Sequence, residues 1–326
     1  MVVPGSAGAE RARPMRLGLD VGGTKTDAVA VDEEDRIVAR VRVRTGWGRE
    51  AVVATILDAI AALRAEGSFG HDAVASVGVG IPGLVDAEGG RVLHAVNLGV
   101  QELDLAAAVR EVLDVPFAVE NDVKAAALGA AALHGDPPSM AYLNLGTGVA
   151  AGVVVDGALW RGARGTAGEV GHISVDPRGR LCGCGQRGCV ETFCGGGAVA
   201  KAWGRPGDLP VLDVFDAADA GDPAAVALRD DIAYGAASAV RILVLSADVE
   251  TVVLGGGLTA LGERLQSVVT RRLREEAEAS AFLRSLRLDE RIELLPAGSP
   301  AAALGAALVG AAHERFGTEK GAGSHG

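Results

Sequence analysis

The hydrophobic pattern begins with three short apolar runs that are separated by turn-forming residues. The runs cover residues 15–19, 28–31 and 37–43, with a glycine-rich turn after the first and the polar turn 32–35 after the second. Short apolar runs bounded by Gly, Asp and Glu are typical of strands joined by tight turns. The first part of the chain is therefore predicted to form a β-meander.

The pattern then takes on helical spacing. In residues 49–64 apolar side chains recur three and four positions apart, at Val52, Val53, Ile56, Ile60 and Leu63. This spacing predicts a helix, and the run 74–81 predicts a strand after it. A helix over 103–113, a strand over 115–119 and an alanine-rich helix over 123–134 follow. Strands and helices thus alternate, as in α/β proteins.

The second half begins as the first half does. Residues 141–145 form an apolar run, Gly146-Thr147-Gly148 is a turn, and 149–155 is another run that ends in the Asp156-Gly157 hairpin signal. The two strand–turn–strand units are about 125 residues apart, a spacing that indicates an internal repeat. A Rossmann domain is excluded locally, because its phosphate turn leads into a helix, whereas both turns here lead into a strand. We expect two α/β domains related by duplication, with a cleft between them.

These elements set the expected domain boundaries. Residues 1–14 mix Gly, Pro, Arg and Glu and are predicted to be a flexible N-terminal arm. Residues 15–122 form the N-terminal α/β domain, and 123–299 form the C-terminal one, with a zinc-binding loop. The apolar run 301–312 is too short to span a bilayer. It predicts a buried C-terminal helix over 300–316 that completes the N-terminal domain.

Composition and charge narrow the class of protein. The 326 residues are 49% hydrophobic with a mean hydropathy of +0.27, enough to bury a large core in two domains. The net charge of −11 disfavours nucleic acid and anionic membranes as partners. No transmembrane stretch or secretory signal is recognisable, which predicts a cytoplasmic protein.

Three glycine turns are candidate phosphate loops. Residues without Cβ let backbone N–H groups approach phosphate oxygens, and a threonine and a lysine add a hydroxyl and a charge. Asp20 places a carboxylate at the end of the first predicted strand, where it could hold Mg²⁺ through water. The third turn, Gly255-Gly256-Gly257, would allow a helix to begin against the ribose or base of a nucleotide. The alternative for each turn is an ordinary glycine hairpin. The candidate nucleotide-binding residues are Asp20, Gly22, Gly23, Thr24 and Lys25; Gly146, Thr147 and Gly148; and Gly255, Gly256 and Gly257.

Asn121 and Asp122 are candidates for the residues that bind and activate an acceptor hydroxyl. They follow a predicted strand and precede a predicted helix, so a carboxylate at this point projects from a strand end. In phosphoryl transfer such a group orients the attacking hydroxyl. The alternative is that one of them only caps the helix, since Asn and Asp are both favoured N-cap residues.

All four cysteines lie close together. His172, Cys182, Cys184 and Cys189 supply the number and type of ligands that a tetrahedral structural Zn²⁺ needs, and four ligands leave no open position. Cys194 is the remaining cysteine, and a Cys₄ site without His172 is the alternative. Glu169 and Glu191 flank this segment and could accept hydrogen bonds from sugar hydroxyls or be plain surface charges.

Together these motifs resemble the ROK (repressor, open reading frame, kinase) family of sugar kinases in the actin-like ATPase superfamily. The resemblance runs from about residue 15 to 312 and also includes Gly80-Ile81-Pro82-Gly83. It implies an actin-like, ribonuclease H-like duplicated fold. It further implies phosphorylation of a hexose, most simply glucose to glucose 6-phosphate, with ATP and Mg²⁺ as cofactors. A homodimer or homotetramer is expected.

The resemblance also assigns residues. Asn121 and Asp122 correspond to the pair that binds the sugar and supplies the catalytic base. Asn97, Glu169, His172 and Glu191 correspond to residues that contact sugar hydroxyls, although Asn97 could also be a turn residue before Gly99. The alternatives are a kinase for N-acetylmannosamine, N-acetylglucosamine or fructose, and a non-catalytic sugar sensor. A DNA-binding repressor is disfavoured, because only about fifteen residues precede the first strand, fewer than a helix-turn-helix module needs.

Overall fold

The computed structural model describes residues 14–321, with side chains up to residue 311. The predicted N-terminal arm lies outside the described residues except for Pro14. The chain divides into two compact units. Unit 1 comprises residues 14–125 and 302–321, and unit 2 comprises 126–301.

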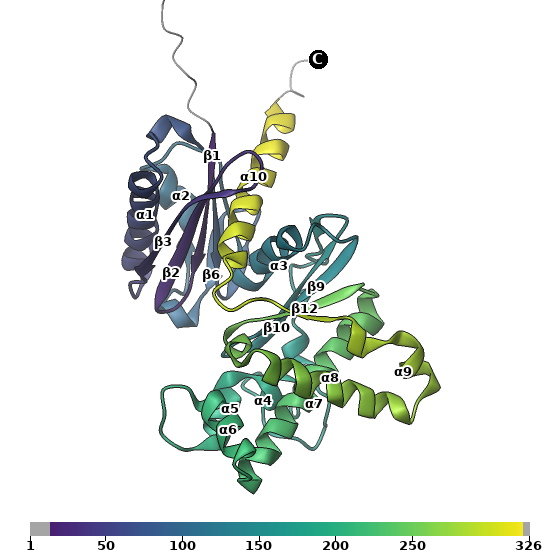
Figure 1. The fold of residues 1–326 in the computed structure, drawn as a ribbon. Helices are drawn as coiled ribbons and strands as arrows, with labels where there is room; N and C mark the ends of the chain where they lie inside the picture. The colour runs from purple at the N-terminus through teal and green to yellow at the C-terminus, as the bar shows by residue number, and fades with distance from the viewer. Residues whose placement is uncertain (1–13, 322–326) are drawn as a thin grey trace, which may run out of the picture. The chain divides into compact units, whose positions relative to one another are not determined.

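Unit 1 is built on a five-stranded sheet (Figure 1). Its strands are β1 (Met15–Val21), β2 (Lys25–Val31), β3 (Ile37–Arg44), β4 (Val74–Ile81) and β8 (Phe117–Asn121), in the order β3-β2-β1-β4-β8. The three sequence-adjacent strands pair antiparallel, whereas β4 and β8 run parallel to β1. The meander and the later strands were predicted, with β8 displaced by two residues from the predicted run.

Helix α1 (Arg49–Glu66) covers one face of this sheet. Leu17 and Leu19 of β1 lie in one hydrophobic core with Val52 and Ile56 of α1. These helix residues are the apolar positions whose spacing predicted the helix. Since side chains alternate between the two faces of a strand, Gly18 points to the opposite face.

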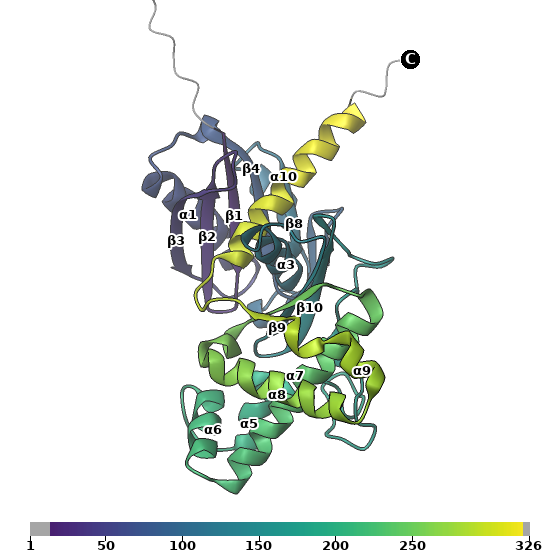
Figure 2. The ribbon, with the colours of Figure 1, turned by 45° about the vertical axis from the view of Figure 1, so that its right-hand side comes forward.

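Helix α10 (Ala301–Gly321) covers that opposite face (Figures 1 and 2). A Cβ at Gly18 would lie 2.0 Å from the Ala303 carbonyl oxygen, and one at Gly78 would lie 1.8 Å from the Ala306 carbonyl oxygen. Both distances are far below van der Waals contact, so only glycine lets the helix backbone lie directly on β1 and β4. No helix within residues 14–321 is both long and apolar enough to cross a membrane.

A small second sheet in unit 1 was not predicted. It consists of β5 (Leu84–Asp86), β6 (Arg91–His94) and β7 (Leu103–Asp104). The helix predicted over 103–113 is wrong in its extent, because α2 spans only Leu105–Arg110. Leu103 and Asp104, the first two residues of the predicted helix, instead form β7 and pair with β6. The Asp104 side chain accepts the Ala107 N–H (2.9 Å) and so caps α2.

Unit 2 repeats the sheet of unit 1. Its strands are β9 (Ser139–Leu145), β10 (Val149–Val155), β11 (Ala158–Leu159), β12 (Thr251–Gly255) and β13 (Ile292–Leu294). The order β11-β10-β9-β12-β13 has the same antiparallel and parallel pairings as the first sheet. The predicted duplication is confirmed.

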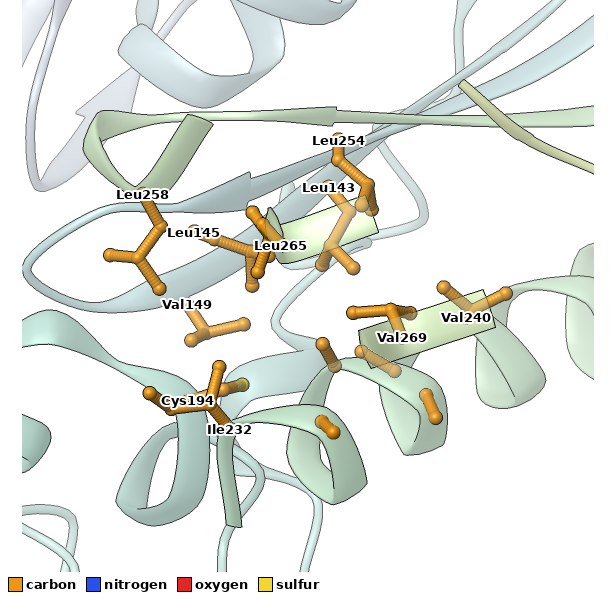
Figure 3. Packing of buried hydrophobic residues seen from close by; sticks show 14 of the residues in the cluster. Leu143, Leu145, Val149, Cys194, Ile232, Val240, Leu254, Leu258, Leu265 and Val269 are labelled. Carbon is orange, nitrogen blue, oxygen red and sulfur yellow. The ribbon is translucent and has the colours of Figure 1, made fainter. Parts of the chain in front are cut away.

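The helices of unit 2 pack on this sheet around a separate core (Figure 3). Leu143, Leu145 and Val149 of the sheet lie in that core with Val240 and Leu265 of the helices. The chain passes from unit 1 to unit 2 within α3, the predicted alanine-rich helix, and returns to unit 1 at the start of α10. Besides α1, α2 and α10, the α-helices are α3 (Asp122–Leu133), α4 (Glu191–Cys194), α5 (Gly196–Trp203), α6 (Pro210–Asp219), α7 (Pro223–Ala247), α8 (Glu263–Glu278) and α9 (Ala281–Leu286).

Candidate functional site

The first glycine turn joins β1 to β2. Gly22 donates its N–H to the Lys25 carbonyl (3.0 Å), and Val21 pairs with Thr26 where the two strands meet. Gly23, Thr24 and Lys25 are exposed. Exposed backbone N–H groups beside a lysine are groups that suit a bound phosphate.

Asp20 lies just before this turn and is partly buried. Its burial and the charges of Asp122 and Asp27 raise the pKa of Asp20 from 3.8 to about 7. Asp27, directly opposite on β2, is itself bound by Arg40 and Arg42 (2.7 and 2.5 Å). Burial alone would raise the pKa of Asp27, but the hydrogen bonds from the two arginines outweigh burial and lower that pKa. Asp20 is therefore the carboxyl in this group whose ionised form gains most from a bound cation.

Asn97 lies beside the same turn. It is exposed, in the short helix η2 (Val96–Leu98), and a Cβ at Gly23 would lie 3.0 Å from its carbonyl oxygen. Gly99 then adopts a left-handed conformation (φ 67°), so the turn expected there exists. Trp47 covers Gly99: a Cβ at Gly99 would lie 2.6 Å from the indole ring, and Trp47 is 70% exposed. Sequence reasoning missed Trp47, although a tryptophan between two glycines is a signal of an exposed aromatic loop.

Asn121 and Asp122 stand at the end of β8, and the structure gives them different surroundings. The Asn121 Oδ1 accepts two N–H groups of the first turn of α3 (3.1 and 3.2 Å), and its Nδ2 donates to the Gly83 carbonyl (3.2 Å). Asn121 is thus a helix cap, the alternative left open above. Asp122 is partly buried, and its charge acts on Asp20. Asp122 and Asp20 are therefore neighbouring carboxyls at the carboxyl ends of parallel strands.

The second glycine turn joins β9 to β10 in the way the first joins β1 to β2. Gly146 donates to the Gly148 carbonyl (3.0 Å). The segment that carries Glu169 and His172 lies along β10, since the Ala151 N–H donates to the Gly168 carbonyl (2.7 Å). Unit 2 thus places the segment of these two residues beside the strand that leaves the turn.

The third glycine run also lies at the end of β9. Gly255 is opposite Asn144, and a Cβ at Gly256 would lie 2.6 Å from the Leu145 carbonyl oxygen. The α-helix expected after the run, α8, begins only at Glu263, because the 3₁₀-helix η4 (Gly257–Leu261) comes first. The second and third glycine turns are therefore neighbours in unit 2.

The cysteine segment folds into a compact cluster that we call the metal cluster. The ligand atoms of His172, Cys182, Cys184 and Cys189 lie within 4.8 Å of one another. The Cys184 and Cys189 sulfurs are 3.6 Å apart, and the His172 Nδ1 is 3.8 Å from the Cys182 sulfur. A tetrahedral zinc with Zn–S and Zn–N distances of about 2.3 and 2.1 Å separates its ligands by about 3.5–3.8 Å. The four residues fit a closed zinc site that uses Nδ1 of the histidine.

The thiols of this cluster differ in acidity. Hydrogen bonds from Gln186, through its backbone and then its side chain, lower the pKa of Cys184 to about 6. Burial raises the pKa of Cys189 to about 12. A cation would favour the thiolate form of both, since metal ligation deprotonates a thiol.

Cys194 does not belong to the metal cluster. It is fully buried, lies in the apolar core with Ile232 and Val149 (Figure 3), and its thiol contacts the Val190 carbonyl (3.5 Å). Burial raises the pKa of Cys194. The alternative Cys₄ site is therefore wrong, because this sulfur is part of the core.

Glu169 and Glu191, which flank the cysteine segment, differ in their burial. Glu169 is exposed, as a surface charge would be. Glu191 is partly buried, and its Oε2 accepts the Val149 N–H (2.9 Å) directly after the second glycine turn. Glu191 is therefore a structural neighbour of that turn, a contact that the sequence pattern did not indicate.

Each unit thus holds one group of the residues singled out from the sequence. Unit 1 brings together the first glycine turn, Asp20, Asn97 and Asp122, which are groups suited to an anion and a cation. Unit 2 brings together the second and third glycine turns, Glu191 and the metal cluster.

Comparison with known proteins gives consistent matches. The model of a family described as the ROK family matches residues 16–312. A glucokinase of Halalkalibacterium halodurans is 32% identical over 270 residues, covering 76% of this chain and 82% of its own. An N-acetylmannosamine kinase of Haemophilus influenzae is 35% identical over 267 residues, covering 79% and 85%. The crystal structure of a ROK family glucokinase from Streptomyces griseus in complex with glucose and AMPPNP superposes with a TM-score of 0.71 at 32% identity, covering 91% of this chain and 99% of that one.

Proposed function

Because the chain belongs to the ROK family, we propose that it is an ATP-dependent sugar kinase that phosphorylates glucose to glucose 6-phosphate. It has the actin-like ATPase fold of its structural relatives. The related structure that superposes over nearly the full length of both chains holds glucose and AMPPNP. This supports a sugar as substrate and ATP as donor.

The observation that carries this proposal is the pair of carboxyls in unit 1. Asp20 lies near the end of β1 and Asp122 directly follows β8, and the two are close enough for the charge of Asp122 to raise the pKa of Asp20. Asp20 also lies beside the first glycine turn. Phosphoryl transfer needs one group to orient the attacking hydroxyl and a second to hold a cation at the phosphates. Two neighbouring carboxyls in different surroundings suit these two roles.

In this reaction Asp122 would orient the sugar hydroxyl and accept its proton, with Asn97 holding another hydroxyl. Asn121 would fix the start of α3 and so the position of Asp122, and could offer its amide to the sugar. Asp20 would hold Mg²⁺ through water; the ion, when bound, neutralises phosphate charge. The backbone N–H group of Gly23 would contact a phosphate oxygen, while that of Gly22 closes the turn on the Lys25 carbonyl.

Unit 2 would supply the remaining contacts. The turn Gly146–Gly148 would bind phosphate, and the run Gly255–Gly257 would lie against the nucleoside. The metal cluster would hold a structural Zn²⁺ that shapes the loop carrying Glu169 and Glu191. His172 would bind the zinc through Nδ1, which leaves Nε2 for a sugar hydroxyl.

The second candidate is an N-acetylmannosamine kinase, because relatives of that name are as similar to this chain as the glucokinase is. N-Acetylglucosamine and fructose are further candidate substrates. A coupled ADP-release assay over these sugars with ATP, and an assay of sugar phosphate formation with polyphosphate as donor, separate the candidates by kcat/KM. Sugar binding without turnover of any sugar would instead indicate a non-catalytic sensor.

We further propose a cytoplasmic enzyme, where a reducing environment keeps the cysteines available for zinc. The family resemblance favours a homodimer or homotetramer, which sedimentation analysis tests directly.

A further inference from the structure

Glu191 makes a specific contact with the second glycine turn. Its Oε2 accepts the Val149 N–H (2.9 Å), and a Cβ at Gly148 would lie 2.5 Å from the same oxygen. The carboxylate therefore occupies the space that a side chain at Gly148 would fill. A side chain at that position would displace the Glu191 carboxylate.

The residues that follow Glu191 bind the same turn from the other side. Gly196 donates to the Gly146 carbonyl (2.8 Å), and Gly197 donates to the Thr147 carbonyl (2.9 Å). Cβ atoms at Gly196 and Gly197 would lie 3.0 and 3.2 Å from these carbonyl oxygens. The run Gly195-Gly196-Gly197, which the sequence analysis left without a role, is thus explained by close backbone contact with the turn.

This segment is also tied to the metal cluster. Cys189 lies two residues before Glu191, and its carbonyl accepts both the N–H and the hydroxyl of Thr192 (2.9 and 2.7 Å). Arg180, in the same loop, donates to the Thr192 carbonyl (2.7 Å) and lies over the Phe193 ring. The position of α4 is therefore fixed by the loop that carries the cysteines.

We propose that Glu191 is a positioning residue for the nucleotide: it holds the turn Gly146–Gly148 in the shape that binds phosphate. This role rests on the proposed function, in which that turn contacts ATP. A carboxylate that accepts a backbone N–H forms a charge-assisted hydrogen bond, stronger than a neutral one. The bond fixes the residue after the turn, while Gly196 and Gly197 fix the turn itself.

The test compares variants of Glu191 that change either the length of the side chain or its charge. Affinity for AMPPNP is measured by titration calorimetry on the metal-loaded protein without sugar. Loss of a hydrogen bond to a charged group weakens an interaction by roughly 10- to 100-fold, so we expect at least about 10-fold weaker binding in Glu191→Ala. Glu191→Asp keeps the charge but is one methylene too short and should weaken binding equally. Glu191→Gln keeps an acceptor oxygen at the same reach but forms a neutral hydrogen bond, so its affinity should lie between those of Glu191→Ala and the wild type. Asp230→Ala, at an exposed acid of the same unit, is the control.

Two outcomes contradict this role. Wild-type affinity in both Glu191→Ala and Glu191→Asp would show that the turn does not need the carboxylate. Binding in Glu191→Gln as weak as in Glu191→Ala would show that the charge, and not the hydrogen bond to the Val149 N–H, matters.

Hydrogen exchange separates this inference from the proposed function. Exchange of the Val149 amide should be at least about tenfold faster in Glu191→Asp than in the wild type, whether or not nucleotide binds. If the wild type binds no AMPPNP, the proposed function fails. Unchanged exchange at Val149 overturns the positioning role.

Discussion

Replacing Asp20 by Asn should stabilise the ligand-free protein while it abolishes activity. The carboxyl is partly buried between other acids, and its pKa is raised from 3.8 to about 7. The folded state therefore binds a proton that the unfolded state has released, over the range between these two values. By linkage, the stability contributed by this group is fully present below pH 3.8 and is lost as the pH rises to about 7.

The size of the effect follows from this difference in pKa. One pH unit corresponds to about 1.4 kcal/mol, so the ionised Asp20 costs the folded state at most about 4 kcal/mol above pH 7. Solvent reaches part of the side chain, and we therefore expect about 2–4 kcal/mol. Asn is neutral and nearly isosteric, so Asp20→Asn avoids this cost. Its advantage should be small at pH 4, grow between pH 4 and 7, and remain constant above pH 7.

Urea unfolding of both proteins at pH 4, 5.5, 7 and 8, without metal or nucleotide, measures this advantage. Circular dichroism follows the unfolding, and amide exchange of β1 reports on unit 1 alone, since a protein of two units need not unfold in one step. Asp58→Asn, at an exposed carboxyl on α1, is the control and should show no such pH dependence. An advantage that is equal at pH 4 and pH 8, or a loss of stability at pH 8, would refute the reasoning.

Four further predictions test other parts of the structure. Asp122→Asn should retain sugar binding in calorimetry but lose about 10²–10⁴-fold in kcat, and near-normal turnover would remove Asp122 from the mechanism. Metal analysis should find about one zinc per chain, and chelation should lower the melting temperature; a metal-free, folded and active protein would contradict the zinc site. Gly78→Ala should destabilise the protein by at least about 1–3 kcal/mol in thermal unfolding, whereas Gly183→Ala, with no atom within 4 Å of the added Cβ, should not. Glucose should change the tryptophan fluorescence in the wild type but not in Trp47→Phe, because Trp47 lies against the loop of Asn97; a full change in Trp47→Phe would place the sugar elsewhere.

The parts of the fold that were predictable are those with a local signal. The strands around Gly22 and Gly146 combine apolar runs with glycine turns, and α1 shows a clear helical period, so both kinds of element were predicted. The helix over 103–113 was predicted too long, since Leu103 and Asp104 have helical spacing but pair with β6. That pairing depends on a strand ten residues away and leaves no local signal.

In the candidate site, too, the features with a local sequence signal were predicted and those that join distant segments were not. The cysteines that gather with His172 carry their chemistry in their spacing, and the structure brings them together as predicted. Trp47 and the Glu191 contact with Val149 were missed, because each joins segments far apart in sequence. Asn121 could be read as a sugar contact or as a cap, and only the hydrogen bonds to α3 reveal the cap. Cys194 is buried like Cys182 and Cys189, and only its place in the hydrophobic core, outside the metal cluster, sets it apart.

The contact of α10 with Gly18 and Gly78 has a consequence for how the chain folds during synthesis. The N-terminal sheet obtains the helix that covers one of its faces from the last part of the chain, whereas unit 2 is one continuous segment. Chains fold as they leave the ribosome, usually from the N-terminus. In this protein the first sheet must wait, with the backbone at its two glycines uncovered, until about 180 later residues have been made. Unit 2 is therefore expected to complete its fold first, and the N-terminal sheet is the part that needs protection on the ribosome.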